Sequence, residues 1–393
     1  MRVLFLTNSL DIGGIETNLI LLAEEMTRRG CSVTAGTSGG QLLPQLEQAG
    51  VEHIKLAMDV MSPAALLSDA RALRRELRHL DPEVIHSFSA TASIVLALAM
   101  GLRRIPFRRR RPPAVLASPM GIVTRPGEPR LLTLARGWAV SLGADRVIVT
   151  SPAIHGLLKW LPIARARMIT MPVQGVRIAA DADPADRPLA LRDSLGLEPE
   201  HKVVTTIGRL DPTKSHELFI DAAARICADR DGVRFLLVGE GSLRGSLERR
   251  VAALGLENEI LLLGARTDVH ALLGITDVCV RPGILEGFAG ITVLEAQSLE
   301  VPVVAFATED VKLAIEDGVT GVLVTPGAIH ELAAAVAGLL DDPDRCSDIG
   351  RAGRSYVERH FAIEQVTGRL LDVYARMLRT QDRGRRLREG RAH

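Results

Sequence analysis

The sequence predicts an α/β protein made of two doubly wound domains, each a parallel sheet with helices on both faces. Its 393 residues exceed what one hydrophobic core usually fills. A short apolar strand, a turn and an amphipathic helix recur in both halves of the chain, which is the order that parallel sheets require. An aperiodic stretch, residues 175–196, separates the two series. We therefore expect domains at 1–178 and 179–361.

The first half opens with the clearest example of this order. Residues 2–7 (RVLFLT) read as a buried strand, residues 8–14 (NSLDIGG) as a turn, and residues 15–30 as an amphipathic helix that Gly30 caps. Residues 90–102 are apolar but too short to cross a bilayer, so they predict a buried helix. A final helix, at about 362–380, is expected to pack back on this domain.

The second half repeats the order three times. Strands are predicted at 202–208, 233–241 and 277–283, each followed by a helical pattern. Ligands of open α/β sheets bind beyond the carboxyl ends of the strands. The turns NSLDIGG, RLDPTK, VGEGS and PGILEGFAG are therefore expected to line one cleft.

Composition describes an ordinary folded chain, with 47% apolar and 24% charged residues. The formal net charge of +1 excludes a bulk polyanion-binding composition. The four cysteines form no close pair in sequence, which fits a reducing cytosol and gives no metal or disulfide framework. The N-terminus has too few apolar residues for a signal peptide, so we expect a cytoplasmic protein, with peripheral membrane contact left open.

Seven segments, which together span nearly the whole chain, carry a family resemblance. Those of the second half are GRLDPTKSHE, FLLVGEGSLRGSLE, the run from ILLLGARTDVH to SLEVPVVA, and EDGVTGVLVTPG. In this order they resemble the C-terminal half of family 4 of the retaining, GT-B-fold glycosyltransferases. The upstream segments GGIETNLILLAEEM, DPEVIHSFSA and ADRVIVTSP resemble the N-terminal domain of the same family.

The resemblance implies two Rossmann-like domains facing a central cleft, the first holding the acceptor and the second a nucleotide sugar. It implies a retaining hexosyltransferase that moves a sugar from a nucleotide diphosphate to a sugar or lipid-linked acceptor, in polysaccharide or envelope glycan biosynthesis. The favoured route is front-face, with the leaving phosphate helping to deprotonate the acceptor. Neither a cofactor, nor a chelated metal, nor a nucleic-acid partner is implied.

Two cations are the first candidates for catalysis. Arg209 and Lys214 follow the strand that opens the second half. A departing nucleotide diphosphate gains negative charge, and preorganised cations stabilise that charge more in the transition state than in the ground state. The resemblance implies that both residues contact the donor phosphates. The plain alternative is a pair of solvated loop side chains, as Arg and Lys usually are.

Two glutamates bracket a glycine-rich loop and are suited to sugar hydroxyls, which donate to carboxylates. The resemblance implies that Glu286 contacts the donor sugar, that Glu295 contacts the ribose, and that the backbone of Phe288, Ala289 and Gly290 contacts phosphate and sugar. Eight residues separate the two acids here, whereas the family has seven. An acid pair that merely serves a helix macrodipole is the alternative.

Glycines make up most of the remaining donor-side candidates. Gly13 and Gly14 precede a helix, where glycine lets a backbone approach a phosphate closely, although a tight turn with positive φ would also need glycine. Gly208 precedes Arg209. The resemblance places the nucleobase against the backbone near Gly264 and Arg266, and Asp268 is expected to cap the next helix.

Two residues are candidates for the acceptor side. His86 closes an apolar strand, although a lone histidine there is as often structural. Met120 stands where the family often has a histidine that contacts the donor sugar, so we assign it to the shape of the acceptor pocket.

A basic cluster suggests a partner of a different kind, an anionic membrane surface. Its arginines are Arg103, Arg104, Arg108, Arg109, Arg110 and Arg111, and a solvated loop is the alternative.

Two other functions also stay open. A non-catalytic sugar-nucleotide-binding protein of a glycan assembly complex would fit Met120 and the eight-residue spacing. A dinucleotide-dependent oxidoreductase is disfavoured because no G-x-G-x-x-G follows the first strand.

Overall fold

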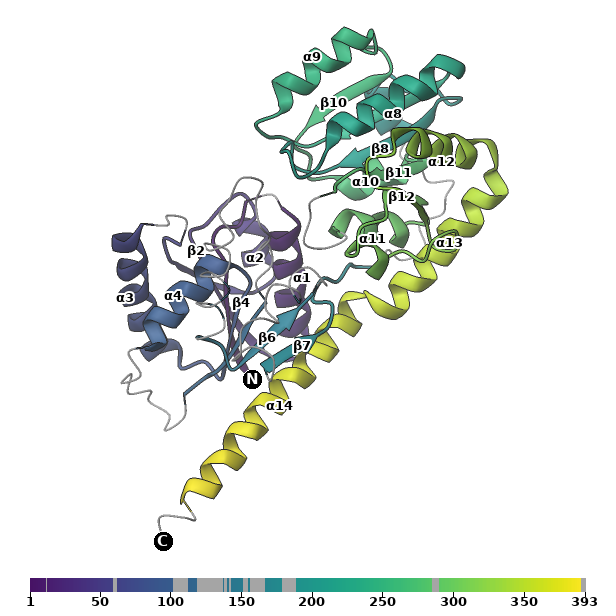
Figure 1. Cartoon of the computed structure of the whole chain (residues 1–393). Helices are drawn as coiled ribbons and strands as arrows, with labels where there is room; N and C mark the ends of the chain where they lie inside the picture. The colour runs from purple at the N-terminus through teal and green to yellow at the C-terminus, as the bar shows by residue number, and fades with distance from the viewer. Residues whose placement is uncertain are drawn as a thin grey trace. The chain divides into compact units, whose positions relative to one another are not determined.

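The structure is a computed structural model that divides into two compact units (Figure 1). Unit 1 comprises Met1–Gly175 and Ile363–His393, and unit 2 comprises Val176–Ala362. The division lies three residues before the predicted boundary at 178, and the last helix belongs to unit 1 as expected. The structure describes residues 1–11, 13–58, 62–101, 112–118, 137, 140, 143–150, 155, 167–178, 189–284 and 290–389.

Unit 1 is built on a seven-stranded parallel sheet in the order β3-β2-β1-β4-β5-β6-β7. The strands are β1 (Arg2–Leu6), β2 (Ser32–Thr37), β3 (Glu52–Lys55), β4 (Val84–Ser87), β5 (Ala114–Ala117), β6 (Arg146–Val149) and β7 (Met168–Thr170). The helices are α1 (Gly14–Arg28), α2 (Leu43–Gln48), α3 (Pro63–Leu80), α4 (Ala90–Gly101) and α14 (Ile363–Glu389).

Alternation along the strands separates the two faces of this sheet. Val3 and Phe5 of β1 pack in a core with α1, α2 and α14, whereas Leu4 and Leu6 pack in a second core with α3 and α4. Successive strand residues point to opposite faces, so this apolar strand is buried on both sides. Unit 1 is therefore doubly wound, and its last helix completes one of its two cores.

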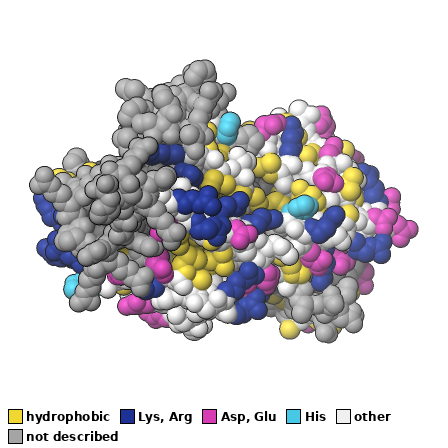
Figure 2. All heavy atoms as spheres, turned by 90° about the horizontal axis from the view of Figure 1, so that it is seen from below, with side chains coloured by type: hydrophobic (Ala, Val, Ile, Leu, Met, Phe, Trp, Pro, Cys, Tyr) yellow, Lys and Arg dark blue, Asp and Glu magenta, His cyan; other side chains and the backbone are white. Residues whose placement is uncertain are grey.

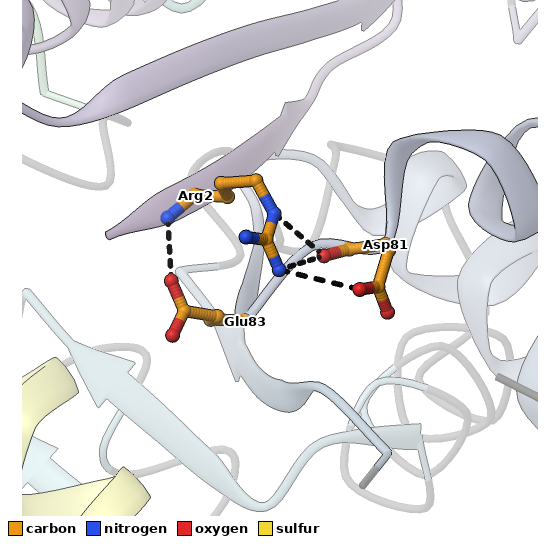
Figure 3. A network of polar contacts seen from close by, with 3 residues as sticks. All are labelled: Arg2, Asp81 and Glu83. Atoms are coloured by element: carbon orange, nitrogen blue, oxygen red, sulfur yellow. Dashed lines mark hydrogen bonds and ion pairs between the residues drawn. The ribbon is translucent and has the colours of Figure 1, made fainter. Parts of the chain in front are cut away.

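A polar network fixes the end of α3 against the first strand (Figure 3). Asp81 caps α3 in the left-handed conformation, with φ of 43°. The Arg2 guanidinium donates from Nε and Nη2 to the Asp81 carbonyl oxygen, over 2.9 and 2.7 Å, and the Arg2 amide donates to Glu83 over 2.9 Å. These bonds tie the turn between α3 and β4 to the first residue of β1.

Unit 2 carries a six-stranded parallel sheet in the order β10-β9-β8-β11-β12-β13. Its strands are β8 (Lys202–Ile207), β9 (Val233–Val238), β10 (Ile260–Gly264), β11 (Val278–Arg281), β12 (Val303–Phe306) and β13 (Val322–Val324). Its helices are α7 (Leu189–Ser194), α8 (His216–Asp229), α9 (Arg244–Leu254), α10 (Val269–Gly274), α11 (Ile291–Ser298), the 3-10 helix η3 (Val311–Leu313), α12 (Ile329–Asp341) and α13 (Pro343–His360).

The helices of unit 2 also cover both faces of their sheet. One core joins the sheet to α8, α9 and α12, and others join it to α10, α11 and the end of α13. Apolar, acidic and basic side chains are mixed on the molecular face in Figure 2, as the near-zero net charge suggests. Within the described ranges, no helix has the length and apolar content to cross a bilayer. The four cysteines are free thiols.

Candidate active site

The loops that follow β8, β9 and β10 are joined through their backbones. The Leu210 amide donates to the Glu240 carbonyl over 2.9 Å, and the Leu243 amide donates to the Leu210 carbonyl over 3.0 Å. The Gly239 amide donates to the Gly264 carbonyl over 2.8 Å. The backbone at the carboxyl ends of three neighbouring strands is therefore linked by hydrogen bonds. It lies at the edge of the sheet where ligands of open α/β folds bind.

Two glycines of the VGEGS turn make this close approach possible. Gly239 and Gly241 have φ of 147° and 159°, a conformation that favours glycine. A Cβ on Gly239 would overlap the carbonyl oxygen of Gly208, and one on Gly241 would overlap that of Leu210. The VGEGS turn was predicted to line the cleft, but Gly239 and Gly241 were not singled out as site residues, although their position beyond a buried strand was the available signal.

The RLDPTK loop holds Arg209 at the surface. Asp211 accepts hydrogen bonds from the amide and the hydroxyl of Thr213, and it lies 3.2 Å from the Arg209 guanidinium. Desolvation raises the pKa of Asp211, but Thr213 and the charges of Arg209 and Lys214 outweigh it and hold this pKa below its usual value. The Arg209 side chain remains 71% exposed, so one short loop presents a positioned, accessible cation.

Lys214 comes from the same loop and lies over Gly208. A Cβ on Gly208 would lie 3.5 Å from Cδ of Lys214 and 3.7 Å from Nε2 of His216. His216 is buried at the start of α8, and its Nε2 lies 3.2 Å from the Arg209 carbonyl oxygen. Ser215, between Lys214 and His216 in sequence, adopts a left-handed backbone conformation with φ of 51°. The structure therefore brings Gly208, Arg209 and Lys214 together beyond β8, as predicted.

Glu295 is a buried carboxylate on α11, a helix that begins after Gly290, whose φ is 89°. Glu295 is 7% exposed, and no hydrogen bond or ion pair joins its carboxylate to any residue that the structure describes. Burial raises the pKa of Glu295 to about 7. The pKa of nearby Cys279 rises to about 12, through burial and then through the charge of Glu295. A buried carboxylate without hydrogen-bond donors is costly, so Glu295, which has none among the described residues, is a candidate to accept hydrogen bonds from a ligand.

Replacing Glu295 with glutamine is expected to remove a pH dependence of folding stability. Because the folded pKa is about 7 and the ordinary value is 4.5, the folded chain retains a proton that the unfolded chain has released between these values. Below pH 4.5 the folded chain has the full stability that the neutral carboxyl allows. Between pH 4.5 and about 7 the folding stability falls by roughly 3 kcal/mol, because the unfolded chain releases the proton first. Urea unfolding at pH 5 and pH 8 measures this loss, which Glu295→Gln should reduce.

The control for this measurement is Glu257→Gln, a change at an exposed position of the same unit. The unfolding free energy of Glu257→Gln should depend on pH as that of the wild type does, since this variant keeps Glu295. Parallel profiles for wild type and Glu295→Gln would show that Glu295 ionises freely in the folded chain.

Arg266 and Asp268 form a bidentate pair beyond β10. The Arg266 guanidinium donates from Nε and Nη2 to the two carboxylate oxygens over 2.8 and 2.6 Å, and this bonding lowers the pKa of Asp268. Asp268 occupies the N-cap position of α10, but its side chain makes no capping hydrogen bond. The capping prediction is therefore right about the position and wrong about the bond, because Arg266 takes the carboxylate. Gly264 ends β10 in the left-handed region, with φ of 70°.

Gly13 and Gly14 lie at the start of α1 in unit 1. Gly13 has φ of −173°, an extended conformation that any residue adopts, and Gly14 is not among the described residues with positive φ. A turn that needs positive φ therefore does not explain this glycine pair. Among the described residues, a Cβ on Gly13 would meet the carboxylate of Glu16 and no other group. Close approach by a ligand stays a prediction for both glycines.

His86 lies in the core of unit 1. The side chain is fully buried. Its Nδ1 lies 2.7 Å from the Tyr374 hydroxyl, and its Nε2 lies 2.7 Å from the Ser118 hydroxyl. The ring stacks on Phe88 with centroids 4.1 Å apart, and burial lowers the pKa of His86 to about 3. The acceptor-side prediction for His86 is corrected here, because a ring with no exposed surface and two occupied nitrogens cannot meet an acceptor.

Several predicted site residues lie outside the described residues. They are Met120, Glu286, Phe288, Ala289 and the arginines Arg103, Arg104, Arg108, Arg109, Arg110 and Arg111. Among the residues that the structure does describe, no group of three histidine, cysteine, aspartate or glutamate side chains is placed to hold a metal ion.

The two doubly wound units have the GT-B fold of glycosyltransferases, as solved structures of similar topology show. Anabaena Alr3699/HepE in complex with UDP-glucose has a TM-score of 0.81 at 23% identity, covering 95% of this chain and 99% of that one. Sucrose-phosphate synthase from Thermosynechococcus elongatus has a TM-score of 0.79 at 20% identity, covering 97% and 100%. Identities this low show the fold alone.

Sequence comparison identifies the family. Residues 189–356 match the model of the glycosyl transferases group 1, and residues 13–174 match that of the glycosyl transferase 4-like domain. The chain belongs to the group 1 glycosyltransferases. A D-inositol 3-phosphate glycosyltransferase of Segniliparus rotundus is 31% identical over 60% of this chain and 53% of its own length. The α-D-kanosaminyltransferase of Streptomyces kanamyceticus is 33% identical over 42% of each. The chain thus spans about half the length of these relatives.

Proposed function

We propose that this chain transfers a hexose from a nucleotide diphosphate sugar to an acceptor, with retention of anomeric configuration, in polysaccharide or envelope glycan biosynthesis. The observation that carries the proposal is the loop beyond β8, which presents Arg209 and Lys214 at the carboxyl end of the unit 2 sheet. We place the enzyme in the cytoplasm, in peripheral contact with the inner face of the membrane. The acceptor is a sugar or a lipid-linked sugar.

Each residue of the unit 2 site has a part in this reaction. Arg209 and Lys214 neutralise the diphosphate as it departs, so the reaction needs no metal ion or other cofactor. Glu295 accepts hydrogen bonds from ribose hydroxyls, which would give its buried carboxylate the donors that it lacks among the described residues. The backbone at Gly264 and Arg266 meets the base, and Glu286 contacts the sugar. The acceptor hydroxyl attacks from the side of the leaving phosphate, which takes its proton.

The similar proteins support a nucleotide-sugar donor without fixing which one. The HepE structure is a complex with UDP-glucose, whereas the sequence relatives include a mannosyltransferase of lipopolysaccharide core biosynthesis from Rhizobium meliloti. A UDP-hexose is therefore the first donor to test, followed by GDP- and dTDP-linked hexoses.

The deciding experiment is a screen of these donors for hydrolysis by the purified protein, with and without EDTA. One donor should be hydrolysed faster than the rest, with a rate that EDTA leaves unchanged, and NMR of the early product should show the donor's anomeric configuration. Donors that raise thermal stability but are never hydrolysed or transferred would instead favour a non-catalytic sugar-nucleotide-binding protein.

A further inference from the structure

His216 is a buried imidazole that contacts the backbone of the RLDPTK loop. It is the first residue of α8 and is 1% exposed. Its Nε2 lies 3.2 Å from the carbonyl oxygen of Arg209, and a Cβ placed on Gly208 would lie 3.7 Å from the same nitrogen. Because a carbonyl oxygen only accepts hydrogen bonds, this contact assigns the imidazole proton to Nε2. The histidine therefore donates to the backbone of the residue whose side chain is proposed to contact phosphate.

The main chain around Arg209 is also held on both sides. The amides of Gly208 and Leu210 donate to carbonyl oxygens of β9 and of the turn that follows it, both over 2.9 Å. The Arg209 carbonyl oxygen accepts a further bond from the Asp211 amide over 2.9 Å, which closes a tight turn within the loop. The bond from His216 joins this turn to a helix. The backbone of Arg209 is thus fixed by the neighbouring strand and by α8.

α8 is a firm support for this bond. Phe219, Ile220 and Ile226 of the helix are buried in the core that it shares with the sheet. Ser215, the N-cap residue, makes no side-chain capping bond, and the His216 bond leaves the helix for the loop. A buried polar nitrogen is costly unless it is hydrogen-bonded, so an apolar side chain would fill this space at lower cost. Neither capping nor packing of α8 therefore explains a histidine here.

We propose that His216 is a positioning residue for the transfer reaction. Through the Arg209 carbonyl it holds the backbone from which the Arg209 side chain reaches the donor diphosphate, and it does not touch the donor, because it is buried. The Arg209 side chain is 71% exposed, so a fixed backbone limits the freedom that this side chain loses when the diphosphate binds. A displaced cation would stabilise the departing charge less. The inference rests on the proposed function, since it requires that Arg209 meets phosphate.

The first test is a double-mutant cycle on turnover of the donor selected by the screen. H216L removes the N–H group and should lower kcat by about tenfold with little change in KM. The variant R209A/H216L should be no slower than R209A, because the histidine acts through the arginine. H216Q offers an amide N–H in place of Nε2–H and should restore turnover to within about threefold of the wild type.

The matched control is T276V, which removes a buried hydrogen bond of unit 2 away from the loop. The hydroxyls of Thr276 and Thr205 lie 2.7 Å apart, and Thr276 precedes the amino end of β11. T276V should lower the thermal midpoint and leave kcat and KM within about twofold of the wild type. If H216L lost turnover merely because unit 2 was weakened, T276V would lose it too, and the losses of R209A and H216L would add.

Hydrogen exchange of the unliganded protein measures the positioning without a donor. The amides of Asp211 and Lys214 are bonded within the loop, over 2.9 and 3.1 Å. They should exchange about tenfold faster in H216L than in the wild type, whereas H216Q and T276V should leave them unchanged. Unchanged exchange in H216L, additive losses in the cycle, or H216Q as slow as H216L would each overturn the inference.

The cycle also separates this inference from the function on which it rests. Wild-type turnover in R209A would refute the phosphate role of Arg209 and the positioning role with it. A large loss in R209A beside wild-type turnover in H216L would overturn the role of His216 alone.

Discussion

Arg209→Ala and Lys214→Ala each lower donor turnover by about a hundredfold, which corresponds to roughly 3 kcal/mol of lost transition-state stabilisation. The expectation rests on both cations coming from one loop at the carboxyl end of β8, where we propose that they face the charge that develops as the diphosphate departs. The Arg209 side chain is 71% exposed, so its removal opens no cavity. Steady-state hydrolysis of the donor selected by the screen measures the effect, with the larger loss in kcat rather than KM.

The matched control is Arg225→Ala, an exposed arginine on α8, the helix that follows this loop. It removes the same charge from the same unit and should change turnover by less than twofold. Thermal midpoints of all three variants should agree within a few degrees. Wild-type turnover in both Arg209→Ala and Lys214→Ala would refute the phosphate-binding role.

Gly239→Ala should destabilise unit 2 by about 3 kcal/mol or more. The added methyl group would overlap the carbonyl oxygen of Gly208, and the φ of 147° is itself unfavourable for alanine. The loops beyond β8 and β9 would have to separate, which would also weaken donor binding. Urea unfolding measures the loss of stability.

Two other glycines separate the effect of overlap from that of backbone conformation. Gly232 has φ of 73° with open space around its missing Cβ, so Gly232→Ala should cost only about 1 kcal/mol. Gly338 lies inside α12, also with open space, so Gly338→Ala should stabilise by about 0.5 to 1 kcal/mol. A Gly239→Ala variant no less stable than Gly232→Ala would show that the two loops are not held together as described.

The order of strands and helices was predictable because each element carries its own periodic signal. The strand expected at 202–208 is β8, Lys202–Ile207, and the helical pattern that follows is α8, His216–Asp229. The turn between them was predicted to carry Arg209 and Lys214, since a short turn after a parallel strand must lie at the carboxyl edge. Local sequence was sufficient to place these two residues because both lie on one short loop, in which Asp211 contacts Thr213 and Arg209.

His86 and Asp268 show where local sequence was insufficient. The place of His86 depends on Ser118 and on Tyr374, which is 288 residues away in sequence. No pattern around VIHSFS reveals that a hydroxyl from the last helix will bind the ring. Asp268 stands at a helix start, yet Arg266 competes for its carboxylate. In both residues a specific partner overrides the usual preference of the residue type.

The packing of α14 in unit 1 has a consequence for the order in which the protein is made. Ile363, Val366, Leu370 and Tyr374 belong to the same core as β1 and α1, although they are synthesised after unit 2. Unit 2, from Val176 to Ala362, is contiguous and can fold while the ribosome is still working. The core of unit 1 stays incomplete, with one apolar face uncovered and His86 lacking the Tyr374 hydroxyl, until residues 363–377 have left the exit tunnel. When the residues up to Ala362 have emerged from the ribosome and those from Ile363 on are still in the tunnel, the nascent chain would therefore present a folded unit 2 and an incomplete unit 1, whose uncovered apolar face chaperones could bind.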